Sequence, residues 1–72
     1  MSFVFINKET GHVNRNVIAQ IIADDENNPD YDRYYIKIIY KITPNECKTV
    51  WLEYGIKDLR DARLLELLGE NK

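Results

Sequence analysis

The sequence predicts an α+β fold, in which a small, bent antiparallel sheet of about four to five strands carries one C-terminal helix. Two observations lead to this fold class. Apolar and polar side chains alternate with a period of two over residues 33–43, as in a half-buried strand, and a leucine-rich segment follows over residues 58–69. A length of 72 residues and a hydrophobic content of 44% predict a single globular domain over residues 1–72.

Two short strands and a third, ambiguous segment are expected first. Residues 2–7 are rich in aromatic and β-branched side chains, and Gly11 ends a turn at a position where a positive φ is easily adopted. Residues 11–14 then return as the second strand of a hairpin. Residues 17–23 are mainly Val, Ile and Ala; a helix beginning at Asn16 is the alternative, but the shortness of the segment favours a strand.

Residues 24–32 are predicted to form an acidic loop, because proline and clustered like charge both oppose regular structure. Two functional interpretations are a divalent-cation loop and a mimic of phosphate that occupies a basic groove on a partner. The segment lacks the glycine that calcium loops use at their sharp turn. The simplest interpretation is a solvated loop whose charge opposes edge-to-edge association of strands. Its acidic residues are Asp24, Asp25, Glu26, Asp30 and Asp32.

A long hairpin is the strongest structural prediction. Pro44 suits the second position of a turn, so residues 33–43 and residues 47–54 are expected to pair as antiparallel strands. The even-numbered side of the first of these strands is expected to face the core, and it consists of Tyr34, Ile36, Ile38, Tyr40 and Ile42.

A helix is expected over residues 58–69, after Gly55 breaks the last strand. Asp58 can cap it, and an acidic first turn suits the positive end of the helix dipole. Leu59 and Leu67 lie outside the expected apolar stripe, and this surplus of leucine indicates a second contact such as self-association. The expected stripe consists of Leu64, Leu65 and Leu68.

Several turn and core segments carry a resemblance to known domains. They are residues 5–7 (Phe-Ile-Asn), 10–14 (Thr-Gly-His-Val-Asn), 16–21 (Asn-Val-Ile-Ala-Gln-Ile) and 58–62 (Asp-Leu-Arg-Asp-Ala). In this pattern the chain resembles small bacterial and phage domains of unknown function, with a pleckstrin-homology-like or SH3-like architecture. The resemblance implies a sheet with a C-terminal helix, and because it includes no catalytic motif it implies no activity.

The composition argues against several classes of function. The single cysteine, Cys47, cannot form an intrachain disulfide, and small secreted domains usually need such crosslinks, so we expect a cytoplasmic protein. His12 is the only histidine, which leaves too few zinc ligands and no partnered nucleophile. We therefore expect no metal, no cofactor and no enzymatic activity. No signal peptide is recognisable, and no apolar run approaches the ~20 residues of a membrane span.

The odd-numbered side of the predicted hairpin carries the candidate binding residues. Tyr35, Ile39 and Trp51 share this side, and aromatic side chains are typical anchors of protein interfaces. Together with Leu67, they predict a small non-enzymatic protein-binding module: an inhibitor, an adaptor or a homo-oligomeric structural piece. Small phage and mobile-element proteins often act in this way. The competing interpretation is that the helix or the first hairpin covers these residues.

A single-stranded nucleic-acid-binding module is the alternative function. Lys37 and Lys41 lie on the aromatic side of the hairpin together with Arg33, and aromatic rings among cations can stack bases. The formal net charge of −2 gives no overall attraction to phosphate. We therefore expect a protein partner or self-association, with nucleic acid as the second expectation.

Overall fold

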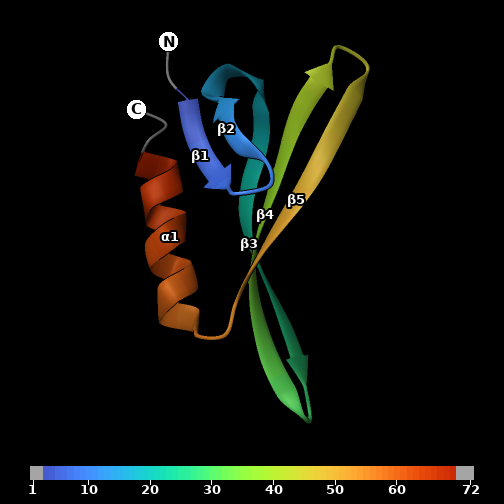
Figure 1. Cartoon of the computed structure of the whole chain (residues 1–72). Helices are drawn as coiled ribbons and strands as arrows, with labels where there is room; N and C mark the ends of the chain where they lie inside the picture. The colour runs from blue at the N-terminus through green and yellow to red at the C-terminus, as the bar shows by residue number, and fades with distance from the viewer. Residues whose placement is uncertain (1–2, 70–72) are drawn as a thin grey trace.

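A computed structural model describes residues 3–69, whose strands form two antiparallel sheets beside one C-terminal helix (Figure 1). The sheet-rich composition with a C-terminal helix is confirmed. The prediction of one sheet of four to five strands is wrong, because β1 and β2 form one sheet and β3, β4 and β5 form another, in the order β3-β4-β5. The elements are β1 (Phe3–Asn7), β2 (Gly11–Asn14), the 3-10 turn η1 (Arg15–Val17), β3 (Ile18–Asn28), β4 (Tyr31–Thr43), β5 (Glu46–Tyr54) and α1 (Lys57–Gly69).

The turn η1 is the reason for two sheets. The side-chain Oδ1 of Asn14 accepts a hydrogen bond from the backbone N–H of Asn16 at 2.9 Å, which caps the turn. The backbone becomes extended again at Ile18, so the ambiguous residues 17–23 form a strand that begins one residue later than predicted. Because the chain changes direction between β2 and β3, these strands do not pair, and the first hairpin packs against the second sheet instead. Residue 2 of the predicted first strand lies outside the described residues.

The prediction of an acidic loop over residues 24–32 is wrong. β3 continues to Asn28 and β4 begins at its register partner Tyr31, so the turn between them has only two residues. Pro29 takes the second turn position, where its fixed φ fits, and the Oδ1 of Asn28 accepts a hydrogen bond from the N–H of Asp30 at 3.2 Å. The acidic side chains alternate between the two faces of the ribbon, which limits their mutual repulsion.

One face of the β3-β4-β5 sheet forms the core together with the first hairpin and α1. Ile36 and Ile38 at the centre of β4 are fully buried, as the alternation over residues 33–43 predicts. Tyr34 is only half-buried, and Ile42 is 53% exposed because this end of the strand projects past the core. The other core residues are Val4, Ile6, Val13, Tyr40, Val50 and Leu67.

Helix α1 docks through a different stripe from the predicted one. Leu67 is fully buried, whereas Leu65 and Leu68 are 72% and 44% exposed. The face that packs on the sheet runs through Arg60, Leu64 and Leu67, at the helical spacing i, i+4, i+7. Leu67 is therefore a core residue, and the prediction that it contacts a partner is wrong.

The far end of the β3–β4 hairpin extends beyond the core as an arm, which we define as residues 24–33. Figure 1 shows this end projecting past the first turn of α1, and the molecule measures 41 × 25 × 19 Å. Every residue of the arm is exposed. The arm holds five acidic residues and one basic residue, so its formal charge is 1 − 5 = −4, and the rest of the chain carries +2 of the total of −2.

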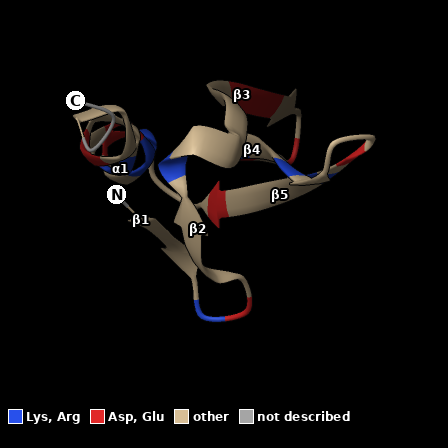
Figure 2. Ribbon diagram, turned by 90° about the horizontal axis from the view of Figure 1, so that it is seen from above, with Lys and Arg blue, Asp and Glu red and all other residues tan. Residues whose placement is uncertain are grey.

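The elements that pack on the β3-β4-β5 sheet, namely β1, β2 and α1, gather on one side of it. Seen from above, the first hairpin and α1 lie to one side of the β3, β4 and β5 strands, and β3 carries a conspicuous acidic segment (Figure 2). The core residues of β1, β2 and α1 pack with one face of the β3-β4-β5 sheet, and the side chains of the other face are more exposed to solvent.

Candidate functional site

The outer face of the β3-β4-β5 sheet, opposite the core, carries the predicted binding residues. Register partners share a face, and the register aligns Ile22 with Lys37 and Lys37 with Trp51, while Tyr35 and Ile39 occupy the adjoining rows. Trp51 is 48% exposed and Ile22 is 38% exposed; the other three are half-buried. The structure therefore places Tyr35, Ile39 and Trp51 on one face, and Tyr35 contacts Trp51 there. The expectation that the helix or the first hairpin covers these residues does not hold fully for Trp51, which borders hollows beside the first hairpin but is 48% exposed.

An aromatic pair forms the centre of this outer face. The ring centroids of Tyr35 and Trp51 are 5.8 Å apart with an interplanar angle of 82°, an edge-to-face contact. The ammonium Nζ of Lys37 lies 5.4 Å from the centroid of the Trp51 ring, within the range of a cation–π interaction. These two contacts hold the indole in one orientation while about half of its surface remains open to solvent.

A hollow of about 310 Å³ lies beside the aromatic pair and is lined by Asp24, Glu26, Tyr35 and Trp51. We call these four residues the acidic notch. Asp24 is the register partner of Tyr35, so strand alternation places the carboxylates of Asp24 and Glu26 on the outer face and that of Asp25 on the core face. Two exposed carboxylates thus adjoin two aromatic rings. The other predicted acidic residues, Asp30 and Asp32, lie further out on the arm.

The basic residues expected to contact nucleic acid do not form one site. Arg33 Nη1 lies 3.9 Å from the Oε1 of Glu53, and the pKa of Arg33 is raised by a hydrogen bond with the Tyr35 side chain and then by the charge of Glu53. Lys37 sits over Trp51, and Lys41 lies near the opposite end of β4, beside the β4–β5 turn. The cations of this face are therefore dispersed and partly neutralised.

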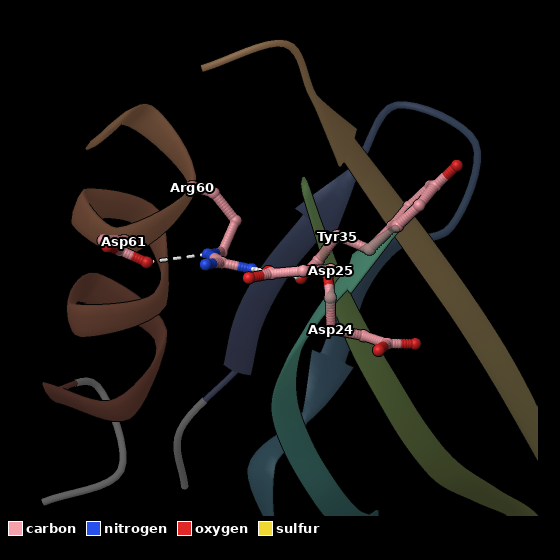
Figure 3. Close-up of polar contacts among 5 residues, drawn as sticks. All are labelled: Asp24, Asp25, Tyr35, Arg60 and Asp61. Carbon is pink, nitrogen blue, oxygen red and sulfur yellow. Dashed lines mark hydrogen bonds and ion pairs between the residues drawn. The ribbon is translucent and has the colours of Figure 1, made fainter. Parts of the chain in front are cut away.

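Arg60 on α1 holds the base of the arm from the core side (Figure 3). Its side chain is only 3% exposed. Nη1 donates hydrogen bonds to the Oδ1 of Asp25 at 2.5 Å and to the backbone oxygens of Asp24 and Tyr35, both at 3.3 Å. Nε donates to the Oδ1 of Asp61 at 2.7 Å. The hydrogen bond to Asp25 raises the pKa of Arg60 against the opposing effect of burial.

The contacts of Arg60 link the helix to the acidic notch. Figure 3 shows the Asp25 side chain directed toward Arg60, whereas the side chains of Asp24 and Tyr35 lie on the other side of the ribbon. Arg60 therefore fixes the main chain of two notch residues while it leaves their side chains free. Sequence reasoning missed this cluster, and the only available signal was a charged residue at the helical spacing of the buried leucine positions.

A second polar contact orders the arm on the solvent side. The hydroxyl of Tyr31 donates a hydrogen bond to the Oε1 of Glu26 at 3.1 Å across the two strands. This hydrogen bond, and after it the negative charge of Glu26, raise the pKa of Tyr31 above its ordinary value of 10.0. Glu26 is therefore held in place at the rim of the acidic notch.

Other kinds of site have less support. Within residues 3–69, no group of three or more His, Cys, Asp or Glu side chains is placed to hold a metal ion. No helix in this part of the chain has the length and apolar character needed to cross a membrane. Cys47 is exposed on β5. Comparisons of the chain with protein-family models, with curated proteins and with solved structures found no match.

Proposed function

We propose that this chain is a small, non-enzymatic protein-binding module that works as an inhibitor, an adaptor or a homo-oligomeric structural piece. The observation that carries the proposal is the outer face of the β3-β4-β5 sheet, where Tyr35 packs against Trp51, and where Ile22 and Ile39 lie on the same face around Lys37. Trp51 and Ile22 remain substantially exposed there. Aromatic and aliphatic side chains clustered on one face are typical of interface centres.

Two further features support a protein partner. The tryptophan and tyrosine rings are already oriented by their edge-to-face contact, so binding would cost little additional side-chain entropy. The outer face is rimmed by charged groups such as Asp24, Glu26 and Glu53, in the arrangement of an apolar centre with a polar rim. We assign the proposed function to this face and not to the helix, because no aromatic anchor accompanies the exposed Leu59, Leu65 and Leu68 within α1.

Affinity capture from a lysate of the source cells tests the proposal. The immobilised protein is compared with Trp51→Ala, and with Leu65→Ala as the control, because Leu65 is 72% exposed on α1 away from the outer face. A captured protein is then purified and titrated against the same variants. We expect wild type and Leu65→Ala to bind equally and Trp51→Ala to bind at least about tenfold more weakly, as for an interface anchor.

Self-association is measured in parallel by the solution mass at micromolar concentration. If Trp51→Ala binds as well as wild type, or if neither a partner nor a dimer is found, the proposal is wrong.

Single-stranded nucleic acid is the second candidate function, and the stacked position of Trp51 beside Tyr35 and Lys37 supports it. The carboxylates of Asp24 and Glu26 oppose it, because they would lie close to any phosphate that followed bases into the acidic notch. Titration of oligonucleotide at low salt, followed by Trp51 fluorescence, distinguishes the two candidates. Unchanged emission excludes stacking on Trp51, since this is the only tryptophan in the chain.

A further inference from the structure

We propose that the acidic notch binds a cationic side chain, an arginine or a lysine, presented by a basic segment of the partner protein. This inference rests on the proposed function and names the chemistry of its partner. The notch combines two different attractions for positive charge: the faces of the Tyr35 and Trp51 rings, and the carboxylates of Asp24 and Glu26. A hollow of about 310 Å³ is large enough for a guanidinium or ammonium group with part of its aliphatic stem.

The Trp51 ring already attracts a cation within the chain itself. Lys37 reaches over the indole to place its Nζ 5.4 Å from the ring centroid. Ring quadrupoles attract any cation in this way, and a guanidinium adds planar stacking to the electrostatic attraction. Trp51 is still 48% exposed with Lys37 in place, so part of the indole remains free to receive a second cation on the notch side.

The carboxylates of the notch supply the charge complementarity. Arg60 contacts only the backbone oxygen of Asp24. The carboxylate of Asp24 has no hydrogen-bond or ion-pair partner among the described residues. Glu26 accepts one hydrogen bond, from the hydroxyl of Tyr31, through its Oε1. The arm that carries both residues has a formal charge of 1 − 5 = −4, so its field attracts a basic segment from a distance.

The notch is also organised before binding. Arg60 hydrogen-bonds to the backbone oxygens of Asp24 and Tyr35, which are register partners on adjacent strands. These bonds fix the separation between one carboxylate and one ring of the notch. Tyr31 restrains Glu26 in the same way from the solvent side. The groups that contact an entering side chain are therefore already ordered in the folded protein, so binding requires little further loss of their conformational entropy.

The test is a titration of the purified protein with four short peptides, followed by Trp51 fluorescence. The peptides are identical except for one central residue, which is arginine, lysine, trimethyllysine or citrulline, the neutral analogue of arginine. We expect saturable changes in emission with the three cationic peptides and none with citrulline. An equal response to arginine and citrulline peptides would overturn the proposal, because the interaction would then not depend on charge.

Two double variants separate the notch from the general charge of the arm. Asp24→Asn with Glu26→Gln neutralises the notch, whereas Asp30→Asn with Asp32→Asn makes the same change in net charge further along the arm. All four side chains are exposed, so both proteins should fold, which circular dichroism verifies. We expect about a tenfold loss of affinity for the arginine peptide in the first variant and less than about a twofold loss in the second. Equal losses would reject the notch.

A third variant, Lys37→Met, removes the cation that competes for Trp51 while it keeps an unbranched apolar side chain of similar length. We expect it to bind the arginine peptide several-fold more tightly, and weaker binding would contradict the proposal. Titration with a single-stranded DNA oligonucleotide gives the outcome that would overturn the proposal. If the Asp24→Asn, Glu26→Gln variant, which we call the notch-neutral variant, binds this DNA, and if wild type binds it more tightly than the arginine peptide, the outer face recognises nucleic acid instead.

Failure of this inference can be told apart from failure of the proposed function. If the partner captured from lysate binds the notch-neutral variant as well as wild type but loses affinity for Trp51→Ala, the protein-binding function stands and the cationic contact is rejected. If Trp51→Ala also retains the partner, both proposals are rejected.

Discussion

The two faces of β4 both present isoleucine and tyrosine side chains, but they differ in burial, and only the outer face also carries Arg33, Lys37 and Lys41. The core face presents Ile36 and Ile38, which are fully buried under α1 and the first hairpin. The outer face presents Tyr35 and Ile39, which are comparably apolar but only half-buried. The alternation of side chains along a strand determines which residues share a face, whereas the elements that pack on the sheet determine which face becomes the core.

The contrast between these faces separates stability from binding. Apolar residues on the core face contribute to folding because water is removed from them in every molecule. Apolar residues on the outer face leave part of their surface in contact with water, so their removal should cost less stability and, under the proposed function, more affinity for the partner. Substitutions at neighbouring positions on opposite faces can therefore test the assignment of each face.

The largest difference is expected between Ile38→Ala and Ile39→Ala. Ile38 is fully buried, so its truncation should lower the free energy of unfolding by about 2–5 kcal/mol, whereas truncation of half-buried Ile39 should cost about 1 kcal/mol or less. Denaturation by urea measures both. Because a loss at the upper end of this range would prevent folding of so small a domain, Ile38→Val provides a milder variant with an expected loss of about 0.5–1.5 kcal/mol. Similar losses at positions 38 and 39 would contradict the distinction between the faces.

Arg60→Met should give the next largest loss of stability. The guanidinium is buried, but Asp25 and Asp61 are 39% and 46% exposed and can be rehydrated, so we expect a loss of about 2 kcal/mol and not the full cost of a buried ion pair. Amide hydrogen exchange should become faster in the arm. Arg63→Met is the control, since Arg63 donates to the backbone oxygen of Phe5 outside the arm and should leave exchange there unchanged. Unchanged exchange in Arg60→Met would show that Arg60 does not order the arm.

A smaller effect on stability is expected at Trp51 than at its neighbour Val50. Val50 is 8% exposed on the core face and Trp51 is 48% exposed on the outer face. Val50→Ala should lower the free energy of unfolding by about 2 kcal/mol, and Trp51→Ala by about 1 kcal/mol, although tryptophan is the larger side chain. Circular dichroism during urea denaturation follows both variants. A greater loss for Trp51→Ala would place the indole in the core.

The smallest expected effect is the pH dependence of the stability that the hydrogen bond between Tyr31 and Glu26 contributes. The hydrogen bond from Tyr31 to Glu26 raises the pKa of the folded phenol, so its contribution to stability is complete below about pH 10 and is lost as the pH rises through the higher pKa of the folded state. The difference in stability between wild type and Tyr31→Phe should therefore disappear at alkaline pH. Urea denaturation of both proteins between about pH 8 and pH 11 measures it. A difference that grows with pH would have the wrong sign.

The sequence predicted the core of the large sheet and part of the outer face, because a period of two over residues 33–43 does not depend on the rest of the fold. It mispredicted residues 24–32, since β3 continues through the five polar residues 24–28, which have no period-two pattern, and the turn that follows consists of only Pro29 and Asp30. Leu67 was misassigned because the rotation of a leucine-rich helix is set by what it docks against. Arg60 could not be predicted, since its partner Asp25 lies 35 positions away and meets it only after docking.

The two bonds from Arg60 to the main chain of Asp24 and Tyr35 have a thermodynamic consequence. A ligand that binds only when these residues are correctly paired also favours the docked position of the helix that supplies Arg60. By linkage, occupancy of the sheet surface must raise the melting temperature and shift the equilibrium of α1, on the opposite face of the sheet, toward its docked position. Conversely, undocking of the helix must weaken ligand binding by the factor by which the ligand favours docking.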